Sequence, residues 1–293
     1  MAEDTKSVLE TIQAGTAWLE KRGVPEARLN MQYMLAHVLG LKRLDLYLQF
    51  DRPLGEAELA PLRLMLQRRG KREPLQHLLG TVDFAGHEFM CDARGLIPRP
   101  ETEQLALKLI AAGPPAPAGE TVQVVDVGCG SGVLGITLAL AWRDRGCEVV
   151  MRDLHGEALA LARENAVACG LDAPVVRFDQ GDLLDGIPGP IHLLVANLPY
   201  IPTAELSGLD PEVGHDPVSA LDGGPDGLVL LRRLAAAAPA VLAPCGVIAL
   251  EVGRGQGGVV VAMLAAAGLA NARCENDLDG VDRFVFASRQ NSQ

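Results

Sequence analysis

The chain has 293 residues and a formal net charge of −11 at pH 7, and 48% of its residues are hydrophobic but only 4% aromatic. The length suits one large or two ordinary domains with a sizeable core. The apolar fraction, carried by Ala, Leu, Val and Gly, fits helices packed on a parallel sheet. A broad nucleic-acid groove is normally basic, so the acidic balance argues against direct nucleic-acid binding.

The cysteines and histidines show neither a disulfide framework nor metal-ligand spacing. The chain has six of each, and no two cysteines form a C-x-x-C pair. We therefore expect reduced thiols, a cytoplasmic protein and no bound metal. The chain does not open on a charged region followed by an apolar one, so no signal peptide is expected. Leu234–Ala243 is apolar but too short to span a bilayer, so no membrane association is expected.

Residues 1–73 predict a small helical bundle that forms the N-terminal domain. Ser7 and Glu10 have the spacing of a capping box, and apolar residues follow at helical intervals. Pro25 suits the beginning of a second helix, and leucines within 59–66 mark a third.

A basic cluster stands near the end of this bundle, formed by Arg68, Arg69, Lys71 and Arg72. A run of charges on a helix is most often a solvated face. A contact with an acidic partner surface is the other interpretation, and the sequence leaves both open.

Residues 74–100 change in character and are expected to link the bundle to the core domain. Phenylalanines on both sides of Gly86 indicate a short hairpin. Residues 101–111 are again helical, and Ala112–Gly119 is a Pro/Gly/Ala-rich surface loop. The core domain is taken as 101–293.

Strands and helices alternate from Thr121 onward, which predicts an α/β domain with a doubly wound sheet. The predicted strands are 121–127, 148–153, 175–178, 191–196, 246–252 and 282–287, and the predicted helices are 134–143, 157–169, 227–242 and 259–267.

A glycine-rich loop follows the first of these strands. Asp126 ends the strand, and glycines at 128, 130 and 132 remove side chains from a surface that backbone can then bring close to a ligand. Asp153 ends the next strand, where it can bind ribose hydroxyls. The run Gly130–Gly135 also fits a dinucleotide pattern, so the loop alone leaves S-adenosylmethionine and a nicotinamide cofactor both open.

The segment Asn197-Leu-Pro-Tyr200 follows the fourth strand, beside the glycine loop at the carboxyl edge of the sheet. Two carbonyl acceptors aimed at a planar NH2 group can raise the electron density on its nitrogen. The side chain of Asn197 supplies one acceptor and the backbone carbonyl of Leu198 the other. Pro199 biases Leu198 toward an extended conformation, and Tyr200 offers a flat face to the substrate. Methyl transfer then depends on positioning and oriented dipoles rather than on a general base.

With these motifs the chain resembles, over nearly its whole length, the protein-glutamine methyltransferases that modify bacterial-type peptide chain release factors (the HemK/PrmC type). The resemblance extends beyond the two loops to other segments. These segments are Pro74–Gly80, Leu96–Glu103, Gly181–Leu183, Asp216–Gly227 and Asp277–Arg283.

The resemblance implies a seven-stranded doubly wound class I methyltransferase (Rossmann-like) domain with a small N-terminal helical bundle that helps to bind the protein substrate. It implies S-adenosylmethionine as methyl donor and S-adenosylhomocysteine as product. A monomer without bound metal is the further expectation, and the sequence leaves the oligomeric state open. The methyl acceptor would be the side-chain amide nitrogen of the glutamine in the Gly-Gly-Gln motif of a release factor.

The expected site combines the residue arguments with the resemblance. The cofactor-binding residues are Asp126, Gly128, Cys129, Gly130, Ser131, Gly132, Asp153, Asp182, Leu183 and Asn197. The catalytic residues are Asn197, Leu198, Pro199 and Tyr200, and these four with Arg99 and Glu101 are expected to contact the substrate. Arg99 and Glu101 could instead form a structural ion pair.

Leu198 stands where this family usually has a proline, and its carbonyl is kept. The same Asn-Leu-Pro-Tyr sequence also occurs in adenine methyltransferases that act on ribosomal RNA. An adenine-amino methyltransferase acting on RNA or DNA, a glutamine methyltransferase of a ribosomal protein, a nicotinamide dehydrogenase and a non-catalytic cofactor-binding regulator are the alternatives. The last two leave Asn197–Tyr200 without a role.

Overall fold

The computed structural model describes residues 6–117 and 119–290, and the chain forms two compact units. The first unit is the chain up to Thr81 together with Asp210–His215, and the second runs from Val82 to Leu209 and onward from Asp216. The segments expected from the sequence, 1–73, 74–100 and 101–293, are a different division and stay a prediction. Residues 1–5, on which the signal-peptide prediction depends, and residue 118 of the predicted loop lie outside the described residues.

The first unit is the predicted helical bundle. Ser7 caps the first helix as predicted, because its Oγ accepts from Glu10 N at 3.3 Å while the Glu10 carboxylate accepts from Ser7 N at 2.8 Å. Gly40 ends the second helix at φ 64°, a left-handed conformation that glycine adopts at low cost. The helices are α1 (Val8–Glu20), α2 (Ala27–Leu39), the 3-10 helix η1 (Arg43–Gln49), α3 (Glu56–Arg69) and α4 (Leu75–Leu79).

The solvated-face interpretation of the basic cluster is wrong for Arg69, whose side chain is only 2% exposed. Its guanidinium donates to Asn30 Oδ1 at 2.6 Å and to Glu212 Oε1 at 2.7 Å. Arg72 also pairs with Glu212, at 2.9 Å, and with Asp210, at 2.8 Å. The acidic partners of these two arginines are therefore in this chain, in the segment Asp210–His215 of the same unit.

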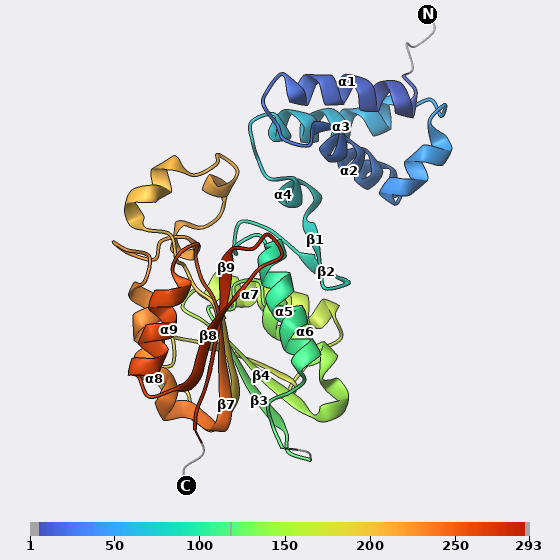
Figure 1. The fold of residues 1–293 in the computed structure, drawn as a ribbon. Coiled ribbons are helices and arrows are strands. Elements are labelled where there is room, and N and C mark those ends of the chain that lie inside the picture. The colour runs from blue at the N-terminus through green and yellow to red at the C-terminus, as the bar shows by residue number, and fades with distance from the viewer. Residues whose placement is uncertain (1–5, 118, 291–293) are drawn as a thin grey trace, which may run out of the picture. The chain divides into compact units, whose positions relative to one another are not determined.

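The second unit contains the predicted hairpin and a seven-stranded sheet (Figure 1). The hairpin pairs β1 (Thr81–Phe84) with β2 (His87–Met90), and the Phe84 and Phe89 rings meet edge to face at 6.0 Å. The sheet has the order β5-β4-β3-β6-β7-β9-β8, in which β9 is antiparallel to both neighbours. Its strands are β3 (Val122–Val127), β4 (Cys147–Asp153), β5 (Val176–Gln180), β6 (Ile191–Asn197), β7 (Leu242–Glu251), β8 (Ala270–Asn276) and β9 (Asp282–Ser288).

This order confirms the seven-stranded doubly wound α/β fold. Six of the strands correspond to runs predicted from the sequence, and β8 was missed. The sequence of β8 is Ala-Asn-Ala-Arg-Cys-Glu-Asn, and none of its residues is fully buried. An edge strand of this kind lacks the apolar signal on which strand prediction depends.

Helices cover both faces of the sheet, and each face has its own core. Leu105, Ile136 and Leu159 belong to the core on one face, and Leu234 and Val260 to the core on the other. Figure 1 shows α8 and α9 on one side of the sheet and α5 and α6 on the other. The helices are α5 (Pro100–Ala112), α6 (Val133–Ala141), α7 (Gly156–Ala168), α8 (Val229–Val241) and α9 (Gly257–Ala266), with short 3-10 turns η2 (Arg143–Arg145), η3 (Thr203–Gly208), η4 (Val213–His215) and η5 (Val218–Ala220).

The chain leaves β3 toward β4 on one side and returns later to β6 on the other, so the strand order reverses between β3 and β6. Ligands of open α/β sheets bind at the carboxyl edge beside such a reversal. The glycine-rich loop follows β3 and the Asn-Leu-Pro-Tyr segment follows β6, so both predicted motifs meet at that place. Among the helices of residues 6–117 and 119–290, none is long and apolar enough to cross a membrane.

The burial of Arg69 predicts a large effect on the stability of the first unit. Arg69→Ala leaves Asn30 Oδ1 without its donor and leaves Glu212 with Arg72 alone, and it should lower the free energy of unfolding by about 3 kcal/mol. Arg68→Ala is the matched control, because the Arg68–Glu73 pair is more than half exposed at the arginine, and it should cost less than about 1 kcal/mol. Urea denaturation followed by Trp18 fluorescence, in a Trp142→Phe background, reports on this unit. Equal losses in the two variants would contradict the structural role of Arg69.

Candidate functional site

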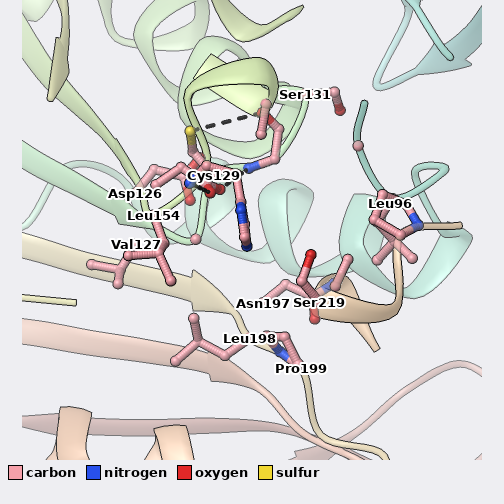
Figure 2. A pocket seen from close by; sticks show the side chains of 18 of the residues that line it. Leu96, Asp126, Val127, Cys129, Ser131, Leu154, Asn197, Leu198, Pro199 and Ser219 are labelled. Carbon is pink, nitrogen blue, oxygen red and sulfur yellow. Dashed lines mark hydrogen bonds between the residues drawn. The ribbon is translucent and has the colours of Figure 1, made fainter. Parts of the chain in front are cut away.

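A cavity of about 420 Å³ opens where β3 and β6 end. The glycine loop forms one wall and Asn197, Leu198 and Pro199 another, as Figure 2 shows. The lining includes twelve of the residues expected from the sequence. These are Arg99, Asp126, Gly128, Cys129, Gly130, Ser131, Asp153, Asp182, Leu183, Asn197, Leu198 and Pro199.

Three other expected residues, Gly132, Tyr200 and Glu101, are not part of this lining. A Cβ on Gly132 would come within 3.0 Å of the Cβ of Ala162, so this glycine allows α6 to pack closely against α7. Gly132 therefore has a packing role in the fold rather than a place on the cavity wall.

The glycine loop is held close to the segment that follows β6. Gly128, Gly130 and Gly132 have φ values of 69°, 54° and 80°, a region that side chains other than glycine rarely adopt. A Cβ on Gly128 would lie 2.7 Å from Leu198 Cδ2, so the two loops touch here and leave no space for a side chain. Gly128 N also donates to Arg152 O at 2.8 Å, which fixes the loop on the end of β4.

Asp126 is a buried carboxyl group on the cavity wall. It is 2% exposed, and its Oδ2 accepts from Gly135 N at 2.9 Å. Burial, with a smaller contribution from the neighbouring charge of Asp153, raises the pKa of Asp126 to about 7, although the hydrogen bond from Gly135 opposes this rise. A carboxylate in this position favours a cationic ligand, because a positive charge in the cavity would stabilise its ionised form.

Asp153 is fixed by backbone donors from two sides. Its Oδ2 accepts from Gly130 N and its Oδ1 from His155 N, both at 2.9 Å. Each carboxylate oxygen has two lone pairs, so both retain capacity for a hydroxyl donor in the cavity. The two hydrogen bonds thus hold the side chain in a defined orientation at the end of β4.

The Asp182–Leu183 turn at the far end of the cavity depends on a buried arginine. Arg152 Nε donates to Leu183 O at 3.1 Å, and Nη2 donates to Asp185 O at 2.6 Å. Leu183 has a φ of 43°, which the two hydrogen bonds help to maintain. A Cβ on Gly181 would fall 2.1 Å from Arg152 Nη2, so glycine is required beside the guanidinium.

The side-chain amide of Asn197 belongs to a chain of hydrogen bonds. Asn197 Nδ2 donates to Thr102 Oγ1 at 2.9 Å, and Thr102 Oγ1 donates to Glu251 Oε2 at 2.7 Å. Asn197 ends β6 and Glu251 ends β7, and these two residues are paired in the parallel register of the strands. Thr102 comes from the first turn of α5.

Tyr200 is not part of the cavity lining, and it contacts the same carboxyl group. Its hydroxyl is 3.5 Å from Glu251 Oε1, and burial together with that carboxylate raises the pKa of Tyr200 to about 12. Gln256 Nε2 donates to Tyr200 O at 2.9 Å and holds the backbone of the segment. The phenol therefore stays neutral at physiological pH.

Arg99 pairs with Asp216 rather than with Glu101. Its Nη2 is 2.5 Å from Asp216 Oδ2, and Asp216 Oδ1 also accepts from Ile97 N at 3.1 Å. Asp216 follows Asp210–His215 in the long connection between β6 and α8, so this pair fastens that connection to the segment before α5. The predicted Arg99–Glu101 ion pair is therefore wrong for Arg99.

Sequence reasoning did not single out Thr102 or Glu251. Thr102 lies inside the Pro-Arg-Pro-Glu-Thr-Glu run, so the run itself was the available signal. Glu251 is 1% exposed at the end of an apolar strand, and a buried acid at a strand end was a second signal. Within the described residues 6–117 and 119–290, no group of three or more His, Cys, Asp or Glu side chains could hold a metal ion.

Comparisons with known proteins find relatives along nearly the whole chain. The PrmC N-terminal domain model matches residues 10–80, and the methyltransferase small domain model matches residues 108–208. A release factor glutamine methyltransferase of Deinococcus radiodurans is 42% identical over 96% of this chain and 98% of its own length. Proteins of the same name from Geobacter sulfurreducens and Chlorobaculum tepidum are 40% and 37% identical, over 92% and 98% of this chain and 92% and 99% of their own lengths. The family resemblance seen in the sequence is confirmed, and the chain belongs to the release factor glutamine methyltransferase family.

Proposed function

We propose that this protein transfers a methyl group from S-adenosylmethionine to the side-chain amide nitrogen of the glutamine in the Gly-Gly-Gln motif of peptide chain release factors. Membership of the family supports the reaction. The observation that carries the proposal is the orientation of Asn197, whose NH2 group is held by Thr102 beside the glycine loop. The adenine and ribosomal-protein alternatives are not favoured, because the full-length relatives carry the release factor name.

The cavity fits the methyl donor by its size and by the chemistry of its lining. A volume of about 420 Å³ lies in the range of pockets for small ligands. Asp126 would hold the donor's ammonium, Asp153 its ribose hydroxyls, and Asp182 with Leu183 its adenine. Gly128, Cys129, Gly130 and Ser131 would contact it through backbone, because the glycines leave no side chain in the way. The bound donor supplies an electrophilic methyl group on a sulfonium.

The residues after β6 act on the acceptor amide. An amide nitrogen is a poor nucleophile because its lone pair is delocalised into the carbonyl. Asn197 Oδ1 and the Leu198 carbonyl would accept from its two N–H bonds, which holds the nitrogen in place and raises its electron density. Since Nδ2 of Asn197 already donates to Thr102, the oxygen is the end of the amide left for the substrate. Pro199 restricts Leu198 to an extended backbone, which aims its carbonyl.

Three further residues and the first unit complete the proposed substrate contacts. Tyr200 holds the shape of the segment, while Arg99 lies on the cavity wall and Glu101 near it. The first unit would help to bind the release factor, and the exposed residues Leu44 and Leu48 of η1 offer it an apolar contact. We further propose that the enzyme acts as a cytoplasmic monomer without direct nucleic-acid binding, in keeping with its charge of −11.

Peptide mass mapping of a release factor incubated with this protein and S-adenosylmethionine tests the proposal. We expect one added methyl group on the peptide that contains Gly-Gly-Gln, and none when that glutamine is replaced by alanine. Methylation of another residue, or none when donor binding is verified separately, would overturn the proposed substrate.

Asn197→Ala should abolish the transfer while leaving donor binding nearly intact. Loss of one acceptor from a preorganised site should lower kcat by about 100-fold or more, and the donor Kd should change by less than about tenfold. Gln123→Ala is the control, because it removes an amide from the opposite end of β3. Steady-state kinetics and calorimetry give the two quantities, and near-normal turnover by the Asn197 variant would contradict the mechanism.

Donor affinity should fall at low pH because of Asp126. Its pKa of about 7 in the free protein means that it takes up a proton below that pH and loses the charge that pairs with the ammonium. Binding should weaken by up to about tenfold per pH unit below this value. Calorimetric titration between pH 5.5 and 7.0 keeps the donor amine mostly protonated, because an α-amino group has a pKa of about 8. Asp126→Asn should bind weakly at every pH, whereas the exposed Asp144→Asn should behave as the unaltered protein. A flat profile for the unaltered protein would refute this role.

A further inference from the structure

Glu251 is a buried acid that the proposed reaction does not use directly. It is 1% exposed and lies at the end of β7, in register with Asn197 at the end of β6. Its Oε2 accepts the Thr102 hydroxyl at 2.7 Å, and its Oε1 is 3.5 Å from the Tyr200 hydroxyl. Burial of a carboxyl group to this depth costs folding free energy, so the position of Glu251 next to Asn197 requires a physical explanation.

The direction of the hydrogen bonds follows from the chemistry of the three groups. An ionised carboxylate only accepts, so the hydroxyl proton of Thr102 must point to Glu251. The oxygen of Thr102 can then only accept from Asn197, and it therefore selects the NH2 end of that amide. Both ends of an asparagine amide fit the same space, so without this selection either end could face the cavity.

We propose that Glu251, acting through Thr102, is the positioning residue that turns the carbonyl oxygen of Asn197 toward the substrate amide. This inference rests on the proposed function. Donation from Nδ2 into a chain that ends on a carboxylate also polarises the Asn197 amide and increases the negative charge on Oδ1. Glu251 thus makes Asn197 a better acceptor without contact with the substrate.

Protonation of Glu251 allows the chain to run the other way. A neutral carboxyl can donate to Thr102 Oγ1, the Thr102 hydroxyl can then donate to Asn197 Oδ1, and the NH2 group would face the substrate. Burial raises the pKa of Glu251 to about 7, and the charge of Glu101 acts in the same direction. The hydrogen bonds from Thr102 and Tyr200 and the charge of Arg283 oppose this rise. Turnover should therefore decrease as the pH falls below about 7.

The test compares kcat profiles of four proteins from pH 5.5 to 8.5, with the donor saturating so that Asp126 does not limit the rate. The unaltered enzyme should lose activity on the acid side. The side-chain amide introduced by Glu251→Gln can both donate and accept hydrogen bonds. This variant should therefore have a kcat about tenfold lower at pH 8, and its kcat should not decrease further at low pH (no acid limb). Thr102→Val, which lacks the hydroxyl, should show the same two changes. Thr102→Ser should keep both the kcat at pH 8 and the decrease of kcat at low pH.

Two controls are the donor affinity of these variants and the kinetics of a variant outside the cavity. The donor Kd should change by less than about threefold in the Glu251 and Thr102 variants, because the chain acts on the acceptor side. Glu148→Gln, on β4 and partnered by Gln123, should leave kcat and its pH profile unaltered. A purely structural role would lower the amount of folded enzyme and leave the pH profile of the remainder unchanged.

The outcomes separate this inference from the proposed function. If the unaltered enzyme does not methylate the release factor, the proposed function fails. If it does, but Glu251→Gln retains the acid limb or Thr102→Val matches Thr102→Ser, the positioning role is overturned and the function stands. The two threonine variants keep the test decisive if Glu251→Gln does not fold.

Discussion

The contact between Gly128 and Leu198 is the constraint on which the site depends. Because the strand order reverses between β3 and β6, the loops after these strands meet at the carboxyl edge of the sheet. A Cβ on Gly128 would lie 2.7 Å from the Leu198 side chain, so the loops pack as closely as backbone permits. The proposed donor pocket and the proposed acceptor residues thus share a wall.

Two buried carboxyl groups lie at this shared wall. Asp126 lies under the glycine loop and Glu251 behind Asn197, and burial raises the pKa of each to about 7. In the proposed reaction a cationic donor would stabilise the ionised form of Asp126, while the hydroxyl of Thr102 stabilises the ionised form of Glu251. The cost of burying them is a stability cost that increases as pH rises toward 7, because the folded protein holds protons that the unfolded chain has released.

The sequence alone predicted those features whose signal lies in residues close together in the chain. Valine-rich runs predicted β3, glycine spacing predicted the loop, and Ser7 with Glu10 predicted the first cap. The sequence did not predict features that lack a local pattern or depend on residues far away in the chain. The polar edge strand β8 has no apolar pattern of its own, and the burial of Arg69 depends on Glu212, far along the chain. The roles of Thr102 and Glu251 could be assigned only from the assembled α5, β6 and β7, because these roles are defined by hydrogen bonds across the fold.

The division of the chain into two units has a topological consequence. Because Asp210–His215 belongs to the first unit, the polypeptide passes between the units three times rather than once. The first unit therefore cannot be excised as one continuous fragment. A shortened protein that began at Val82 would retain Asp210 and Glu212 without their arginine partners. Both acids lie in the connection between Asn197–Tyr200 and α8. The helical bundle therefore supplies the ion-pair partners of a segment from the distant connection, and is not a detachable accessory module.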